Sequence, residues 1–269
     1  MNRLLDIVSS GVEVFDLAQP LSAETPSSPN HPGFKMALMR RHGDSVRDDG
    51  SSAANEMIVT GGHVGTHVDA LAHVSYKGRL HGGVSAEEAQ VGGRFSDLGV
   101  DTIAPMVCRG VLLDVAGLYG TDTLPGGYGI TEDDLEAAAQ KAGVEVGRGD
   151  VALVRSGWAA RFRDPEAFLG HATGVPGPTE GAARWLADKG VRATGAETIA
   201  YEQIKPELGH ALLPAHRLLL VERGVHIIEV MNLTALAEAG VHEFAFVLAP
   251  LNIVGGTGSP ARPLAVVER

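Results

Sequence analysis

The sequence contains little cysteine, few aromatic side chains and no long hydrophobic run. One cysteine among 269 residues cannot form an internal disulfide, which is typical of proteins in a reducing cytoplasm. The longest apolar stretches, residues 218–221 and 244–250, fall well short of the roughly 18 apolar residues that a membrane helix needs. Residues 1–6 have an acid at position 6 and no sustained apolar core, so we expect no signal peptide. These absences predict a cytoplasmic protein with no membrane partner.

Positive charge is also scarce. Lysine and arginine number 22 against 33 aspartates and glutamates, which gives a formal net charge of −11. An acidic surface repels phosphate backbones, so no nucleic acid is expected as a partner. The single cysteine, Cys108, lies in an apolar run that indicates a buried strand, and we interpret it as an inert core residue rather than a catalytic thiol.

The pattern of apolar residues and turn residues predicts the fold class. Glycine is abundant, at 35 of 269 residues, which favours a loop-rich protein over a helix bundle. Apolar or alternating runs predict strands at residues 12–17, 35–39, 56–60, 110–115, 151–155, 192–196, 226–231, 243–248 and 264–267. Capping signals predict helices that begin after Ser85 and Thr131, and further helices at residues 181–189, 214–223 and 233–239. We therefore predict a single α/β domain over residues 1–269, with a mixed central sheet or a barrel-like β core flanked by helices.

Residues 18–55 differ from the rest of the chain. Four prolines exclude a regular helix in the first part of this segment, and residues 40–52 are charged and contain glycine. The prolines are Pro20, Pro26, Pro29 and Pro32. We interpret the segment as a Pro-rich N-terminal loop or arm that acts as a lid or binding loop, and a surface excursion without a role is the alternative.

Histidines cluster between residues 63 and 81. They are His63, His67, His73 and His81. In an extended chain, residues 63, 67, 69 and 73 would all point to one side, whereas on a helix Asp69 would leave the face shared by the first two histidines. Nearby glycines also disfavour a regular helix. We predict a strand end and loop at which His63, His67 and Asp69 converge, while the direction of His73 stays open.

Two histidines and an aspartate suit a divalent metal ion such as Zn²⁺ or Mn²⁺. Three protein ligands leave a position open for a water that can ionise near neutral pH and attack a carbonyl group. A fourth group, His73, would then transfer the proton. The alternative is a set of core or surface histidines satisfied by hydrogen bonds.

The run His63-x-Gly65-Thr66-His67-x-Asp69-x-x-x-His73 resembles the signature of the cyclase-like metal-dependent hydrolases. That group includes bacterial kynurenine formamidases, isatin hydrolases and polyketide cyclases. Further similar segments are Asp16-Leu17-x-x-Pro20-Leu21, Ser156-Gly157-Trp158, the run from His216 to Leu220, and Ile227-Ile228-Glu229.

The resemblance implies a swivelling β/β/α fold and one or two divalent metal ions, Zn or Mn, per subunit. It implies that His63, His67 and Asp69 bind the first metal, and that Asp69 bridges to a second one. It further implies that His216 and Glu229 complete the second position and that His73 is the general acid/base. The family is generally oligomeric, so the resemblance also implies a homodimer or homotetramer.

Glu229 supports this interpretation independently, because a carboxylate in an apolar run is costly unless it is paired or metal-bound. Its alternative partner is a buried arginine, Arg217. Weaker candidates for the site are His210, Glu197 and His226.

The sequence departs from the family pattern in two places. Leu71 stands where the family often has proline. Residues 25–30 contain no aromatic side chain, where the formamidases carry a tryptophan, and this counts against kynurenine formamidase activity. Phe34, Tyr76 and Trp158 are the candidates to line the pocket instead.

These observations predict a metal-dependent hydrolase that cleaves an amide, lactam or formamide C–N bond of a small carbonyl compound by a metal-activated water. The substrate would be a small molecule. The first alternative is a polyketide-type cyclase or dehydratase that uses the same metal site. The second is a non-catalytic metal-binding protein.

Overall fold

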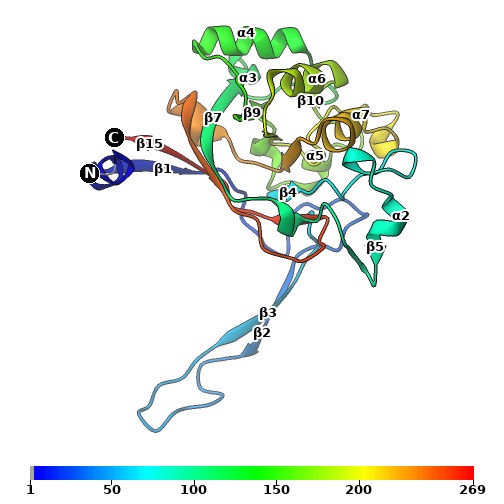
Figure 1. Cartoon of the computed structure of the whole chain (residues 1–269). Helices are drawn as coiled ribbons and strands as arrows, with labels where there is room; N and C mark the ends of the chain where they lie inside the picture. Colours follow the sequence, from blue (N-terminus) through cyan, green and yellow to red (C-terminus); the bar gives the residue numbers. More distant parts are fainter. Residues whose placement is uncertain (1–2) are drawn as a thin grey trace.

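A sheet of nine strands forms the centre of the protein in the computed structural model, which describes residues 3–269 (Figure 1). Met1 and Asn2, the start of the stretch interpreted as lacking a signal peptide, lie outside the described residues. In sheet order the strands are β1 (Val12–Asp16), β15 (Leu264–Glu268), β13 (Glu243–Leu248), β7 (Met106–Asp114), β9 (Val151–Arg155), β11 (Ala193–Ala196), β12 (His226–Glu229), β4 (His67–Asp69) and β14 (Gly258–Pro260). The four strands from β7 to β12 run parallel, and both ends of the sheet are antiparallel. The predicted mixed α/β sheet is confirmed.

The parallel strands are buried on both faces. Along β7, Val111 and Leu113 belong to the core beneath the helices, whereas Leu112 belongs to the core on the other face. This burial explains why the central strands read as nearly continuous apolar runs. Cys108 lies on the same strand and is half-buried.

Helices gather over one side of the parallel strands, where Figure 1 shows α4, α6 and α7. The helices are α1 (Arg3–Ser10), α2 (Ala86–Ala89), α3 (Val115–Leu118), α4 (Glu132–Ala142), α5 (Pro165–Leu169), α6 (Glu180–Lys189), α7 (Pro214–His216) and α8 (Thr234–Glu238). Within residues 3–269, no helix combines the length and the apolar character needed to cross a membrane.

Capping residues set the helix ends where the sequence predicts them. Ser85 caps α2, which is a single turn, and Thr131 begins α4 with a capping box. Gly143 ends α4 in the left-handed conformation that glycine adopts readily. The prediction of a helix over residues 214–223 is right in extent, but only α7 is α-helical and the following segment, η5 (Arg217–Arg223), is a π-helix. Such π-helical insertions often occur at functional sites.

Several short elements were not predicted. Helices α1, α3 and α5 were not predicted, nor was the three-residue strand β14, whereas β4 lies where the sequence predicts a strand end. Two-residue strands also pair outside the main sheet; they are β5 (Gln90–Val91), β6 (Arg94–Phe95), β8 (Gly129–Ile130) and β10 (Gly177–Pro178). Elements this short carry too few residues to establish a periodicity.

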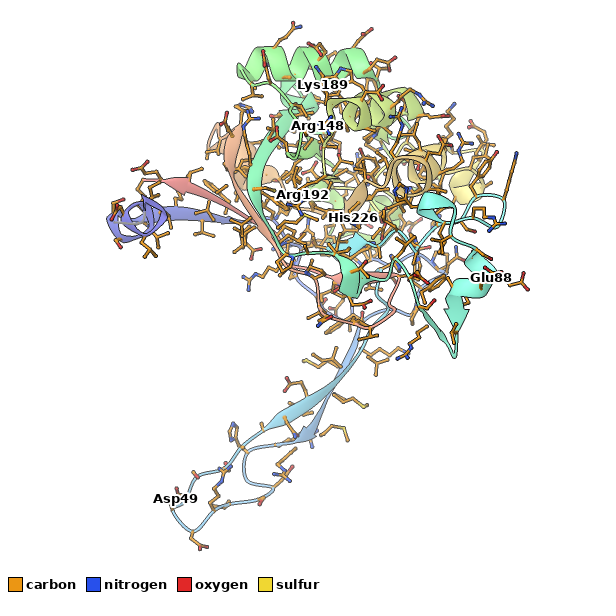
Figure 2. All side chains as sticks on the ribbon, in the orientation of Figure 1. Asp49, Glu88, Arg148, Lys189, Arg192 and His226 are labelled. Carbon is orange, nitrogen blue, oxygen red and sulfur yellow. The ribbon has the colours of Figure 1, made fainter. Side chains whose placement is uncertain are left out.

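A hairpin projects from the body of the protein and is called here the arm, residues 35–59. It consists of β2 (Lys35–Arg40) and β3 (Asn55–Val59), which pair antiparallel and confirm the predicted strands (Figure 1). Every residue of both strands is exposed. Figure 2 shows the side chains of the hairpin standing clear of the body, with Asp49 in the loop near the tip. At its base, the Gly61 amide donates a hydrogen bond to the Pro32 carbonyl at 3.0 Å.

Candidate metal centre

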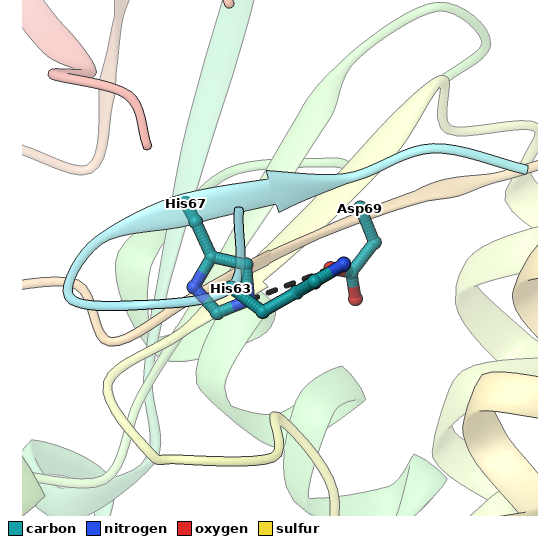
Figure 3. A group of neighbouring side chains, drawn as sticks. All are labelled: His63, His67 and Asp69. Atoms are coloured by element: carbon teal, nitrogen blue, oxygen red, sulfur yellow. Dashed lines mark hydrogen bonds and ion pairs between the residues drawn. The ribbon is translucent and has the colours of Figure 1, made fainter. Parts of the chain in front are cut away.

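The predicted cluster forms on a short strand and the turn before it (Figure 3). His67 and Asp69 lie on β4, two residues apart, so they share one face of the strand. His63 approaches from the preceding turn, and its Nδ1 lies 2.8 Å from Asp69 Oδ1. One ligand atom from each of His63, His67 and Asp69 lies within 4.8 Å of the others. The predicted convergence of the three residues is therefore present in the structure.

The non-ligand residues of the motif hold this turn against its neighbours. Gly65 has a φ of +65°, and an added Cβ would collide with the side chain of Leu21. Thr66 Oγ1 accepts a hydrogen bond from the Gln19 amide at 2.8 Å and donates one to the Val230 carbonyl at 2.6 Å. The threonine thus ties the turn to the end of β12 and explains its place in the motif.

His216 and Glu229 join the same cluster from distant parts of the chain. Glu229 ends β12, directly opposite His67 in the antiparallel register with β4. His216 Nε2 lies 3.1 Å from Glu229 Oε1 and 3.8 Å from Asp69 Oδ2. Glu229 Oε2 lies 3.4 Å from His67 Nε2. Asp69, His73 and His216 form a second group whose ligand atoms lie within 4.8 Å of one another.

The alternative partner proposed for Glu229 is wrong. Arg217 lies at the surface, where it pairs with Glu180 and Glu222 at 3.1 Å each. The buried partners of Glu229 are His67 and His216.

His73 turns toward the cluster rather than away from it. Its amide donates to the Ala70 carbonyl at 2.9 Å, and its ring stacks on that of His63 with 3.9 Å between centroids. Burial lowers the pKa of His73 to about 3, despite the opposing charge of Asp69. The imidazole is therefore neutral at neutral pH. His81, the fourth clustered histidine, lies apart and donates from Nδ1 to the Val221 carbonyl at 2.9 Å.

Electrostatics around Asp69 favour a charged carboxylate. Burial opposes its charge, but the charge that His73 carries when protonated at low pH, together with the hydrogen bonds from His63 and His67, holds the pKa of Asp69 well below its usual range. Burial likewise opposes the charge of His67, but the hydrogen bond with Asp69 and the charges of Asp69 and Glu229 raise its pKa to about 9. Burial raises the pKa of Glu229, although its hydrogen bond with His216 acts in the opposite direction.

One oxygen of Asp69 still lacks a partner. Within residues 3–269, Asp69 Oδ2 and Arg155 Nε are the buried side-chain polar atoms without a hydrogen bond. A buried carboxylate oxygen left in this state costs free energy unless another group binds it. Imidazole nitrogens and carboxylate oxygens are preferred ligands of Zn²⁺ and Mn²⁺. The arrangement therefore fits a divalent metal ion.

A cavity of about 250 Å³ lies over the cluster. Besides the histidines and Glu229, its lining includes Ile199, Ala200 and Leu213. Two more histidines line the cavity. His31 was not predicted from the sequence, whereas His210 was one of the weaker candidates. Burial lowers the pKa of both.

The three aromatic candidates do not line this cavity. Trp158 is buried and donates from Nε1 to the Phe168 carbonyl at 2.8 Å. Tyr76 is exposed and stacks against Arg217, and Phe34 is likewise absent from the lining. The expectation of an aromatic wall from these residues is wrong, because Trp158 packs in the core, Tyr76 lies at the surface and Phe34 is not part of the lining.

The remaining candidates, His226 and Glu197, make hydrogen bonds but belong to neither group that could hold a metal. His226 Nδ1 donates to the backbone carbonyl of Asp69 at 2.9 Å. Glu197 is fully buried and accepts hydrogen bonds from the backbone amides of Ser156 and Gly157. Glu202, which the sequence analysis missed, accepts a hydrogen bond from His216 Nδ1 at 2.8 Å. No motif spacing pointed to Glu202, because it contacts His216 only through the fold.

The raised pKa of His67 predicts a pH-dependent stability of the metal-depleted protein. Folded protein holds this proton between pH 6.5 and about 9, whereas the unfolded chain releases it near 6.5. The contribution of protonated His67 to the free energy of unfolding is thus complete below pH 6.5 and is lost as pH rises through 9. The free energy of unfolding should fall by roughly 3 kcal/mol over this window, measured by denaturant titration of chelator-treated protein.

Two controls make that measurement specific. His67→Gln should reduce the decline, and saturating Zn²⁺ should abolish it, because a metal ligand must be deprotonated. A metal-depleted protein whose stability stays constant or rises between pH 6.5 and 9 would contradict the charge state assigned to His67.

Comparison with known proteins agrees with this geometry. Residues 15–203 match the family model described as "Putative cyclase". The chain is 29% identical over 271 residues to an isatin hydrolase of Roseibium aggregatum, with 98% of this chain and 95% of the relative covered.

Solved structures share the whole fold. A crystal structure described as a novel cyclase has a TM-score of 0.85 at 28% identity, with 98% of this chain and 92% of that one covered. Isatin hydrolase A from Ralstonia solanacearum has a TM-score of 0.76 at 27% identity, with 100% and 98% covered. Together with the buried His/Asp cluster, these matches show that the chain belongs to the cyclase family of metal-dependent hydrolases.

Proposed function

We propose that the protein hydrolyses an amide, lactam or formamide C–N bond of a small carbonyl compound by a metal-activated water. The observation that carries the proposal is the buried group of His63, His67 and Asp69, with its unpartnered Asp69 Oδ2 beside a neutral His73. Relatives that are isatin hydrolases support a lactam as the first substrate class to test.

In this proposal the chain holds the metal with residues from both parts of the cluster. His63, His67 and Asp69 would bind a first ion, and Asp69 would bridge to a second one held by His216 and Glu229. A divalent metal bound there supplies Lewis-acid polarisation of a carbonyl and lowers the pKa of a coordinated water.

His73 is the group that transfers the proton. From its position beside Asp69 and His216, its imidazole accepts a proton from the attacking water and then donates it to the leaving nitrogen. Stacking on His63 keeps the ring within the cluster throughout this transfer. The same group thus serves as base and then as acid.

The cavity favours hydrolysis over the cyclase alternative. Its volume of about 250 Å³ lies below the common range for drug-sized ligands, which favours a small substrate over a polycyclic polyketide. A non-catalytic metal site is also disfavoured, because such a site needs neither an open cavity nor a proton-transfer group such as His73.

We also propose that the protein forms a homodimer or homotetramer through the arm. An isolated two-stranded hairpin is at best marginally stable in water, and both strands of this one are exposed. Its side chains include several large apolar ones: Met36, Leu38, Met39, Met57, Ile58 and Val59. A second copy of the chain packed against the arm would remove them from water. The arm begins and ends close in sequence to His31 and His63, so this interface would lie near the cavity.

Replacement of His73 tests the catalytic proposal. His73→Ala should retain its metal content and lose activity, with kcat lower by about 10²- to 10⁴-fold, because only proton transfer is removed. The assay is product analysis on metal-loaded protein with isatin, an N-formyl arylamine and a simple aromatic amide as substrates.

His81→Ala is the matched control for that variant, since His81 does not line the cavity and donates its Nδ1 hydrogen bond to the Val221 carbonyl. It should keep full activity. If His73→Ala turned over at the wild-type rate, the role given to His73 would be wrong. If the metal-loaded wild type released no hydrolysis product from any of these substrate classes, the proposed reaction would fail.

Charged substitutions on the arm test the proposed oligomer. Met36 and Ile58 are cross-strand partners, so Met36→Lys with Ile58→Glu keeps the hairpin paired while it places charge in the interface. Analytical ultracentrifugation should show a shift to monomer. Val107→Lys, at another exposed strand position, is the control and should not change the mass. A wild type that is monomeric, or a double variant that stays oligomeric, would contradict the proposal.

A further inference from the structure

We infer that Glu202 is a positioning residue that fixes the ring of His216 for metal binding. This inference rests on the proposed function, because it concerns the second position of the same centre. Glu202 is a buried glutamate in the loop after β11, and it is 2% exposed. It contributes no ligand atom to either group that could hold a metal.

The carboxylate of Glu202 makes its hydrogen bonds to one turn of the chain. Its Oε1 accepts from both the backbone amide and the Nδ1 of His216, each at 2.8 Å. Its Oε2 accepts from the Ala215 amide at 2.9 Å. One side chain therefore fixes the start of α7 and the ring that this helix carries.

This contact determines which nitrogen of His216 can bind a metal. A carboxylate is an acceptor, so the proton must lie on Nδ1, and Nε2 is left with its lone pair in the metal-bound state. Nε2 is the atom that faces Glu229 and Asp69, at 3.1 Å and 3.8 Å. A carboxylate behind a ligating histidine fixes both the tautomer and the orientation of its ring.

Backbone conformation supports the same conclusion independently. Tyr201, directly before Glu202, and Val230, directly after Glu229, both have a φ of +56°. Left-handed backbone is uncommon for residues other than glycine, and a β-branched valine rarely adopts it. Both residues are fully buried. The two carboxylates that flank His216 are thus each placed by a costly bend.

Specific hydrogen bonds maintain these bends. The Val230 carbonyl accepts from Thr66 Oγ1, and the Val230 amide donates to the Thr198 carbonyl at 3.1 Å. Thr198 Oγ1 donates to the Tyr201 carbonyl at 3.2 Å. Thr66 therefore links the bend at Val230 to the metal-binding motif through its side chain, and Thr198 links that bend to the one at Tyr201 through its backbone carbonyl and its hydroxyl. Such over-determined strain is typical of functional sites.

The chain supplies a matched control in Glu197. This glutamate is also fully buried, and its Oε2 accepts the amides of Ser156 and Gly157 at 2.9 and 2.6 Å. It contacts none of the proposed ligands. Replacing either glutamate with glutamine changes a buried carboxyl group that accepts backbone amides, but only Glu202 contacts His216.

The test is a metal titration of chelator-treated full-length protein with Zn²⁺ and with Co²⁺, whose visible absorption reports ligand geometry. Glu202→Gln should bind 10- to 100-fold more weakly at the position that His216→Ala abolishes, and its Co²⁺ spectrum should change. Glu202→Asp should recover part of the affinity. Glu197→Gln should bind like the wild type even if it unfolds at a lower temperature.

Nitrogen NMR of the Zn²⁺-loaded wild type tests the inference even if Glu202→Gln does not fold. The spectrum should show His216 with its proton on Nδ1 and the metal on Nε2. The opposite assignment, or a Glu202→Gln variant with unchanged affinity and spectrum, would overturn the positioning role while leaving the metal centre intact. A wild type that binds neither ion would instead overturn the proposed function itself.

Discussion

The buried carboxylate of Asp69 is the constraint around which the site is built. It is completely removed from water, and its charge is stabilised by histidines on both sides. One of its oxygens nevertheless has no hydrogen-bond partner in residues 3–269. An ionised group in such surroundings is strongly unfavourable unless a cation or donor completes its environment. A divalent metal would meet this requirement, and the surrounding residues offer the ligands that such an ion prefers.

The rest of the fold brings distant residues to that carboxylate. Strand β4 inserts between β12 and β14, and the register places Glu229 opposite His67. His216 lies at the end of α7, on the helical side of the sheet, where α7 continues into a π-helical segment. Several features around the cluster lower the stability of the fold. They are a π-helix, two left-handed non-glycine residues and several buried charges. The extensive apolar cores on both faces of the sheet offset these costs, so stability and function are divided between different parts of the chain.

The sequence allowed prediction of those features that depend on local pattern. Long apolar strands such as β9 and helices with clear caps such as α4 were placed closely, and the histidine motif indicated its own convergence. Features that depend on tertiary contacts were not predictable. Strand β14 has three residues, too few to show alternation. Glu202 lies in no motif, and its role is visible only through its hydrogen bond with His216.

Metal content per subunit, determined by mass spectrometry on protein purified without chelator, tests the central claim most directly. The wild type should carry one or two equivalents of Zn or Mn, and Asp69→Ala should carry almost none. Asp150→Ala is the matched control, because Asp150 is also buried but pairs with Arg109 at 2.7 Å, away from the cluster. It should keep the wild-type content. A wild type without metal that also takes up none on reconstitution, or an Asp69→Ala variant with its full complement, would contradict the account.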